Sequence, residues 1–347
     1  MKFFKKTAHL VLNWSIAAAS TDAPAKSQDK KGDKKIDFAI GGQAVIEGVM
    51  MRSPNNITIA VRKPSGKVKV DKRPYNTLTQ RYKWLNIPIL RGVVNLFEMM
   101  VIGTKAINFS ANESLEEEEH EEQSRSAAKA PSKWGKALEI GMFSLSLVLA
   151  LTLSLFLFKF IPLGLTTLLE SQSSFIQKNY IVFNLIDGFI KTLIFFSYIF
   201  LLSLIPSFRR VFEYHGAEHK SIFTYEKKLP LEPEHAKAQT RFHPRCGTSF
   251  IIIVFVISIL VYTFVPKQEA FINNLLLRIT FLPIIAGISY EYLKLSAKYV
   301  DNKFVKALVA PGLWFQRLTT KEPDRSQLEI GLASLKTALE MEKAASA

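Results

Sequence analysis

The chain has 347 residues, of which 48% are hydrophobic and one, Cys246, is a cysteine. This apolar content exceeds what most soluble folds need, and a single cysteine excludes an internal disulfide. The net charge of +15 suits contact with anionic lipid head groups or ribosomal RNA. Because basic cytoplasmic loops of a membrane protein give the same excess, we expect no sequence-specific nucleic-acid binding.

The N-terminal segment 1–19 begins with basic residues and an apolar run, as a signal peptide does. His9, Asn13 and Trp14 interrupt that run, so we interpret it as an amphipathic helix lying on the membrane. A polar, flexible linker is predicted at 20–35.

Residues 36–112 predict a small α+β cytoplasmic domain. "GGQAVIEGVMMRSP" (41–54) predicts a strand with tight turns, and "NITIAVRKPSGKVKV" (56–70) predicts a β-hairpin around Pro-Ser-Gly. Arg91 and Glu98 interrupt the apolar run at 87–109, which favours a helix on the sheet or membrane surface. An acidic linker is predicted at 113–136.

Region 137–300 predicts about four transmembrane helices, because it contains apolar runs close to the roughly 20 residues that cross a bilayer. The runs are 140–161, 180–205, 248–265 and 271–293. The last one contains Arg278, which we expect to reach the membrane interface, together with Pro283 and Glu291. Residues 301–347 predict C-terminal helices, the last with Leu328, Leu332, Leu335 and Leu339 on one face.

Basic residues predict the orientation. The loop 207–247 contains Arg209, Arg210, Lys220, Lys227, Lys228, Lys237, Arg241 and Arg245, whereas the loops on the other side offer little beyond Lys178 and Lys267. The positive-inside rule therefore places this loop and both termini in the cytoplasm. The predicted fold class is an α-helical membrane protein with about four transmembrane helices and a small α+β cytoplasmic domain that contains a β-hairpin.

Asp187 and Lys191 lie four residues apart within the second predicted span. Such a pair belongs either to an ion or proton path or to a self-neutralising contact between helices. We favour the structural contact.

The stretch "RRVFEYHGAEHKSIF" (209–223) contains His215 and His219 with Glu218 between them. On a helix the two imidazoles share a face and are able to chelate zinc, with Glu218 as general base. This H-x-x-E-H order is typical of inverted zinc peptidases, for which Glu291 is a candidate third ligand. Gly216 costs a helix about 1 kcal/mol relative to Ala, which leaves the regularity of the segment open.

His243 and Cys246, in "TRFHPRCGTSF" (240–250), lie just before the third predicted span. With His215 and His219 they complete a nitrogen and sulfur set for a closed, structural zinc. The alternative is an open site of His215, His219 and either Glu291 or Cys246, with a position left for water. Without metal, the histidines bind lipid phosphate or backbone carbonyls.

Four motifs, "GGQAVIEGVMMRSP", "FEYHGAEHK", "RFHPRCGTSF" and "APGLWFQRLTTKEP", resemble the YqhQ-like family of bacterial multi-pass membrane proteins. The resemblance implies a bacterial plasma-membrane location and a metal-dependent enzyme. It points to His215, Glu218, His219, His243 and Cys246 as the matching positions.

Two functions follow from these patterns. The first is a zinc-dependent hydrolase at the membrane surface, acting on a membrane-protein segment or a lipid head group. The second is a non-enzymatic membrane-protein biogenesis or scaffold factor, whose basic cytoplasmic domain binds a partner such as the ribosome or an assembly factor.

Overall fold

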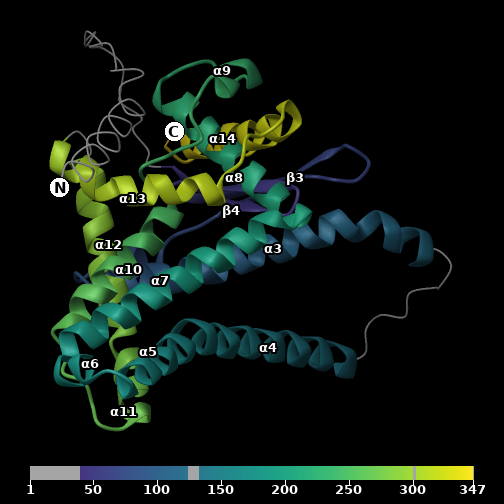
Figure 1. Ribbon diagram of the computed structural model, residues 1–347. Helices are drawn as coiled ribbons and strands as arrows, with labels where there is room; N and C mark the ends of the chain where they lie inside the picture. Colours follow the sequence, from purple (N-terminus) through teal and green to yellow (C-terminus); the bar gives the residue numbers. More distant parts are fainter. Residues whose placement is uncertain (1–39, 124–132, 300–301, 347) are drawn as a thin grey trace. The chain divides into compact units, whose positions relative to one another are not determined.

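The computed structural model describes residues 40–123, 133–299 and 302–346 (Figure 1). The predicted helix at 1–19 and linker at 20–35 lie outside these residues. A four-stranded antiparallel sheet comes first, in the order β1 (Gly41–Val45), β2 (Gly48–Arg52), β3 (Asn56–Arg62) and β4 (Val68–Pro74). The hairpin predicted at 56–70 is confirmed, with Gly66 at a φ of 81° in its turn. Segment 41–54 contains two paired strands instead of one.

Both faces of the sheet are covered. Ile57, Ile59 and Val61 pack on Ile102 of helix α3 (Leu90–Gln123). The opposite face meets helix α14 (Arg325–Ser346), where the Thr58 hydroxyl donates to the Ser334 carbonyl oxygen at 2.9 Å. The polar half of the β3 alternation is therefore buried as well, because a helix lies where a one-sided sheet would meet water.

Helix α3 follows the short helices α2 (Leu78–Arg81) and η1 (Lys83–Leu85). It continues through residues 113–123, which the sequence assigns to the acidic linker, because glutamate is a good helix former. Both charged residues that interrupt its apolar run have polar partners. Arg91 forms an ion pair with Glu291, and Glu98 accepts a hydrogen bond from the Leu78 amide at 2.8 Å.

The described residues contain three helical segments long and apolar enough to cross a membrane: Ser144–Ser171, Tyr180–Leu204 and Phe271–Ser296. The helices of this region are α4 (Lys133–Leu155), the π-helical turn η2 (Phe156–Phe160), α5 (Ile161–Ser171), α6 (Ser174–Lys178), α7 (Tyr180–Leu204), α10 (Gly247–Thr263), α11 (Phe271–Thr280) and α12 (Leu282–Lys298). The third predicted span corresponds to α10, which has 17 residues and a length of about 25 Å. Because the hydrocarbon core is roughly 30 Å thick, a fourth crossing stays a prediction.

A buried polar cluster joins these helices. Asp187 on α7 lies 3.3 Å from the Lys191 ammonium and accepts a second hydrogen bond from Arg278 on α11. Arg278 also donates to the Asn184 side-chain oxygen at 2.6 Å. The expectation that Arg278 reaches the interface is wrong, since its side chain is only 5% exposed and pairs inside the protein. The ring of Tyr262 on α10 lies against the cationic groups of Lys191 and Arg278, and also against that of Lys159 on η2.

The C-terminal segment packs on the sheet and on helices that precede the third predicted span. After α13 (Lys303–Thr319), helix α14 buries Leu328, Leu332 and Leu335 of its predicted apolar stripe. It contacts β2, β3 and helix α8 (Pro206–Glu226), and short helix α9 (Pro233–Lys237) lies beside it (Figure 1). The sheet, α8 and α14 therefore form one packed body, although they come from distant parts of the chain.

Glu342 of α14 is a hub in this body, and its removal is expected to destabilise the protein. Its carboxylate accepts hydrogen bonds from the Ser53 hydroxyl, the Asn55 amide and side chain, and the Asn56 side chain, at 2.6 to 3.0 Å. Glu342→Ala removes the partner of the buried Ser53 and Asn56 donors, at roughly 1–3 kcal/mol each, so its melting temperature should fall well below that of the exposed-site control Glu340→Ala.

The same carboxylate predicts a pH dependence. Burial opposes ionisation of Glu342, but the hydrogen bonds from Ser53, Asn55 and Asn56 outweigh it and lower the pKa. A lowered pKa in the folded state gives stability that is full above about pH 4.3 and is lost as the pH falls further. Thermal melts of Glu342→Gln should lack that acid-side loss. Equal pH profiles for this variant and the wild type would contradict the assignment.

Candidate metal centre

Helix α8 carries the H-x-x-E-H motif and runs unbroken through Gly216. The glycine is required by a close approach: a Cβ at this position would lie 2.1 Å from the Lys321 carbonyl oxygen. The Lys321 amide in turn donates to the Phe212 carbonyl at 2.8 Å. The segment after α13 is thereby fastened to α8 beside the two histidines.

His215 and His219 lie one turn apart, with ring centroids separated by 4.5 Å. The His215 Nδ1 donates to the Thr319 carbonyl at 2.8 Å, and the His219 Nδ1 donates to the Arg241 carbonyl at 2.6 Å. These bonds leave each Nε2 unprotonated in a neutral ring. A carbonyl on the far nitrogen is the arrangement that orients metal-binding histidines.

Cys246 completes a group of three. It is the N-cap of α10, and its sulfur lies 3.1 Å from the His215 Nε2. The ligand atoms of His215, His219 and Cys246 all lie within 4.8 Å of one another. Within the described chain, the buried His219 Nε2 has no hydrogen-bond partner. Zinc bonds of roughly 2.0–2.3 Å in a tetrahedron place ligand atoms about 3.5 Å apart, so the group needs a contraction of about 1 Å.

Burial and neighbouring groups set the protonation of these residues. Burial lowers the pKa of His219, which keeps its ring neutral. Burial opposes the Cys246 thiolate, but interactions with His219 and Thr248 outweigh it, so the pKa of the thiol falls below its ordinary value. Burial raises the pKa of Glu218 to about 8.

Glu218 lies beside this group without being part of it. The Gly42 amide of β1 donates to its carboxylate, and a Cβ at Gly42 would lie 2.8 Å from the Glu218 Cγ. The glycine of the "GGQAVIEG" stretch therefore makes room for this buried side chain. Oε2 of Glu218 has no hydrogen-bond partner in the described structure.

The other predicted ligands are engaged elsewhere. The His243 Nε2 lies 3.4 Å from a Glu226 carboxylate oxygen, and its Nδ1 accepts from the Arg245 amide at 3.3 Å. Glu291 is held in an ion pair by Arg91. The structure therefore assembles the open set that includes Cys246, and it does not bring His243 or Glu291 into that set.

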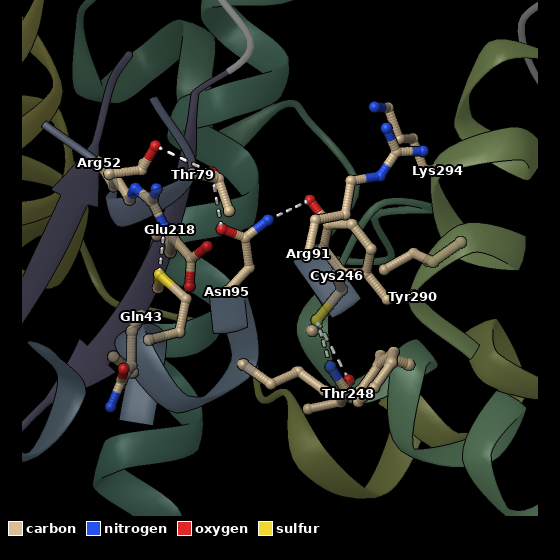
Figure 2. Close-up of a pocket in the computed structure, with 18 of the residues that line it drawn as sticks. Gln43, Arg52, Thr79, Arg91, Asn95, Glu218, Cys246, Thr248, Tyr290 and Lys294 are labelled. Atoms are coloured by element: carbon tan, nitrogen blue, oxygen red, sulfur yellow. Dashed lines mark hydrogen bonds between the residues drawn. The ribbon is translucent and has the colours of Figure 1, made fainter. Parts of the chain in front are cut away.

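A cavity of about 1050 Å³ adjoins the group. Its walls come from the sheet, α3, α8, α10 and α12, and they include His215, Glu218 and Cys246. Figure 2 shows Cys246 and Thr248 on one side and Glu218 on another, with Asn95 between Thr79 and Tyr290.

The comparisons with known proteins agree with the sequence motifs. A family model described as "Protein of unknown function (DUF1385)" matches residues 87–341. The chain belongs to this family. It is 34% identical over 311 residues to the Uncharacterized protein YqhQ of Bacillus subtilis (strain 168), covering 89% of this chain and 94% of that protein. No solved structure matches. The predicted resemblance is confirmed, and neither the family's description nor the relative's supplies an activity.

Several cavity residues were not predicted from the sequence. Arg52, Lys83 and Lys294 belong to three separate elements; Arg52 lies in the motif at 41–54 without an assigned role, and the two lysines lie outside the four motifs. Thr248, whose amide lies 3.4 Å from the Cys246 sulfur, follows a predicted ligand by two positions. A search for polar residues next to the helix start at Cys246 could have found Thr248, whereas the cations required the tertiary structure.

Proposed function

We propose that this family member is a zinc-dependent hydrolase in the bacterial plasma membrane, with His215, His219 and Cys246 as ligands. One observation carries the proposal. Both imidazoles bind carbonyls through Nδ1, the His215 Nε2 lies 3.1 Å from the Cys246 sulfur, and the ligand atoms of all three residues lie within 4.8 Å of one another. Two histidines and a cysteine leave a tetrahedral zinc one position for water, whose pKa the ion lowers to about 7.

The surrounding residues support a hydrolytic site. His215, Glu218 and Cys246 line the cavity, so a substrate there meets the ligands and the carboxylate together. Gly42 fixes one side of Glu218, and the unpartnered Oε2 is able to accept a proton. The charge of a bound zinc ion would lower the raised pKa of Glu218, because a nearby cation favours the ionised carboxylate. The ionised Glu218 is accordingly the proposed general base, and later the acid that returns the proton to the leaving group.

Packing supports four crossings and a cytoplasmic site. The sheet precedes the first candidate span, α8 follows the second, and α14 follows α12, yet these elements pack together. They lie on one side of the membrane only if the chain crosses an even number of times between each pair. If α11 and α12 cross together, α10 must cross too, despite its 17 residues. The basic loop 207–247 makes that side the cytoplasm, with both termini there.

The test is the zinc content of full-length protein, purified in a neutral maltoside detergent and measured by mass spectrometry. We expect about one zinc per chain, as three ligands with an open position bind one ion. Glu218→Gln should retain the metal, because Glu218 is not among the ligands. Wild-type protein with no stoichiometric metal after growth in zinc would overturn the proposal.

The contact between the His215 Nε2 and the Cys246 sulfur, 3.1 Å, also favours a second function. Without metal, Cys246 would be the nucleophile and His215 its base, at the start of a helix whose free amides suit a developing oxyanion. Stoichiometric alkylation of Cys246 by iodoacetamide in protein as purified, lost in His215→Ala, would favour this function. Protection of the thiol by bound zinc would exclude it.

A further inference from the structure

The cavity beside the candidate metal centre has an excess of positive charge. Arg52, Lys83, Arg91 and Lys294 line it, against one carboxylate, Glu218. Arg91 is neutralised by Glu291. Within the described residues, no ion pair joins Arg52, Lys83 or Lys294 to a carboxylate, and both lysines are exposed. Arg52 also donates to the Met99 sulfur and lies over the Tyr75 ring, so the two exposed lysines are the cations best able to meet an anion, with Arg52 beside them.

The start of α10 adds to this excess. Gly247 and Thr248, in its first turn, line the cavity next to Cys246. The amides at a helix start carry partial positive charge and favour anions, phosphate above all. Glu218, a side chain that is 5% exposed and whose Oε2 has no hydrogen-bond partner in the described structure, lines the same cavity. An anion at this position would lie beside the reactive groups.

Part of the remaining lining is apolar and belongs to helices of the predicted membrane region. Leu293 and Lys294 belong to the last residues of the candidate span Phe271–Ser296, and Phe250 belongs to the first turn of α10. The end of a span is the part that meets lipid head groups, so this apolar wall suits the region between head groups and acyl chains. Next to the lining residues Lys83 and Asn86, Trp84 and Ile87 are 66% and 56% exposed, as expected for side chains inserted at an interface.

We propose that this cavity binds the phosphate-bearing head group of an anionic lipid. Arg52, Lys83, Lys294 and the α10 start hold the phosphate, and the apolar wall holds the glycerol and the first part of the acyl chains. The lipid is also the substrate class of the hydrolase, a statement that rests on the proposed function. Hydrolysis joins the hydroxyl of water to phosphorus, breaks the bond to the leaving alcohol, and gives that alcohol the proton carried by Glu218.

Binding of short-chain lipids to full-length protein in maltoside micelles tests the proposal. The probes are dihexanoyl phosphatidylglycerol, dihexanoyl phosphatidylcholine and glycerol 3-phosphate, with affinity measured by native mass spectrometry and by microscale thermophoresis. We expect phosphatidylglycerol to bind about tenfold tighter than phosphatidylcholine, since a net negative charge meets unpaired cations. Glycerol 3-phosphate competing as well as phosphatidylglycerol would show a soluble ester site and overturn the lipid assignment.

Variants locate the site. Lys83→Ala with Lys294→Ala should weaken phosphatidylglycerol binding about tenfold or more, while Lys227→Ala with Lys228→Ala, an exposed pair outside the cavity lining, should leave it unchanged. Equal losses in the two variants would contradict a cavity site. Unchanged zinc content in the cavity variant shows that it folds.

Zinc content and lipid binding, measured on the same preparation, separate the two proposals. Selective phosphatidylglycerol binding without any stoichiometric zinc in the native protein supports the lipid site and overturns the metal centre. Stoichiometric zinc with equal affinity for both lipids overturns the lipid site alone.

Discussion

Replacing His219 by alanine is expected to abolish zinc binding, whereas replacing His243 is expected to leave it intact. Both histidines are buried, and their ring centroids lie only 5.6 Å apart. They differ in the partner of the Nε2 atom. The Nε2 of His219 has no partner in the described residues and belongs to the group of three, while the Nε2 of His243 meets Glu226.

The expected difference in zinc content is large, because a site that keeps only two of its three ligands binds zinc weakly. Loss of a residue that merely hydrogen-bonds to a ligand already costs about 10–100-fold in metal affinity. His219→Ala and Cys246→Ala should therefore contain less than about a tenth of the wild-type zinc. His243→Ala is the matched control, since it also empties a buried imidazole site on the same side of α8. Glu291→Gln is a second control.

Two outcomes would change this assignment. Loss of zinc in His243→Ala, with a normal melting temperature, would restore the closed four-ligand set predicted from the sequence. Retention of zinc in His219→Ala would remove that residue from the site. Circular dichroism and size-exclusion profiles establish that each variant folds before its metal content is compared.

Replacing Asp187 by leucine is expected to produce the largest loss of stability in the membrane region. The Asp187 carboxylate binds both Lys191 and Arg278, and all three side chains are at most 5% exposed. Leucine fills a similar volume but leaves two buried cations without this partner. Breaking a buried ion pair from one side costs about 3–5 kcal/mol, several times the roughly 0.6 kcal/mol of an average interhelical hydrogen bond in a membrane.

The measurement is the temperature at which half of the detergent-solubilised protein loses its size-exclusion peak. Phe189→Ala is the control, because Phe189 lies on the same helix with 68% exposure and contributes lipid-facing surface instead of a helix contact. The double variant Asp187→Leu with Arg278→Met should recover part of the loss, since it removes a stranded charge. A melting temperature for Asp187→Leu equal to that of Phe189→Ala would show that the cluster does not hold α7 to α11.

The sequence by itself determined the local elements. Alternation around Pro-Ser-Gly predicts the β3–β4 hairpin, leucines at helical spacing predict the buried face of α14, and three long apolar runs predict the helices able to cross a membrane. The four-residue spacing of His215 and His219 likewise places both imidazoles on one helix face. These features depend on residues close together in the chain, whose side-chain periodicity follows directly from helix and strand geometry.

The tertiary structure alone decided which distant residues meet. Cys246 joins the histidines and His243 does not, although the two residues are three positions apart and offer equally suitable ligand atoms. Arg278 turns inward because Asp187 lies on a neighbouring helix, and Arg52, Lys83 and Lys294 reach one cavity from three separate elements. No local pattern encodes these meetings, because each depends on how α8, α10, α12 and the sheet pack, and packing is selected by the apolar surfaces that those elements bury together.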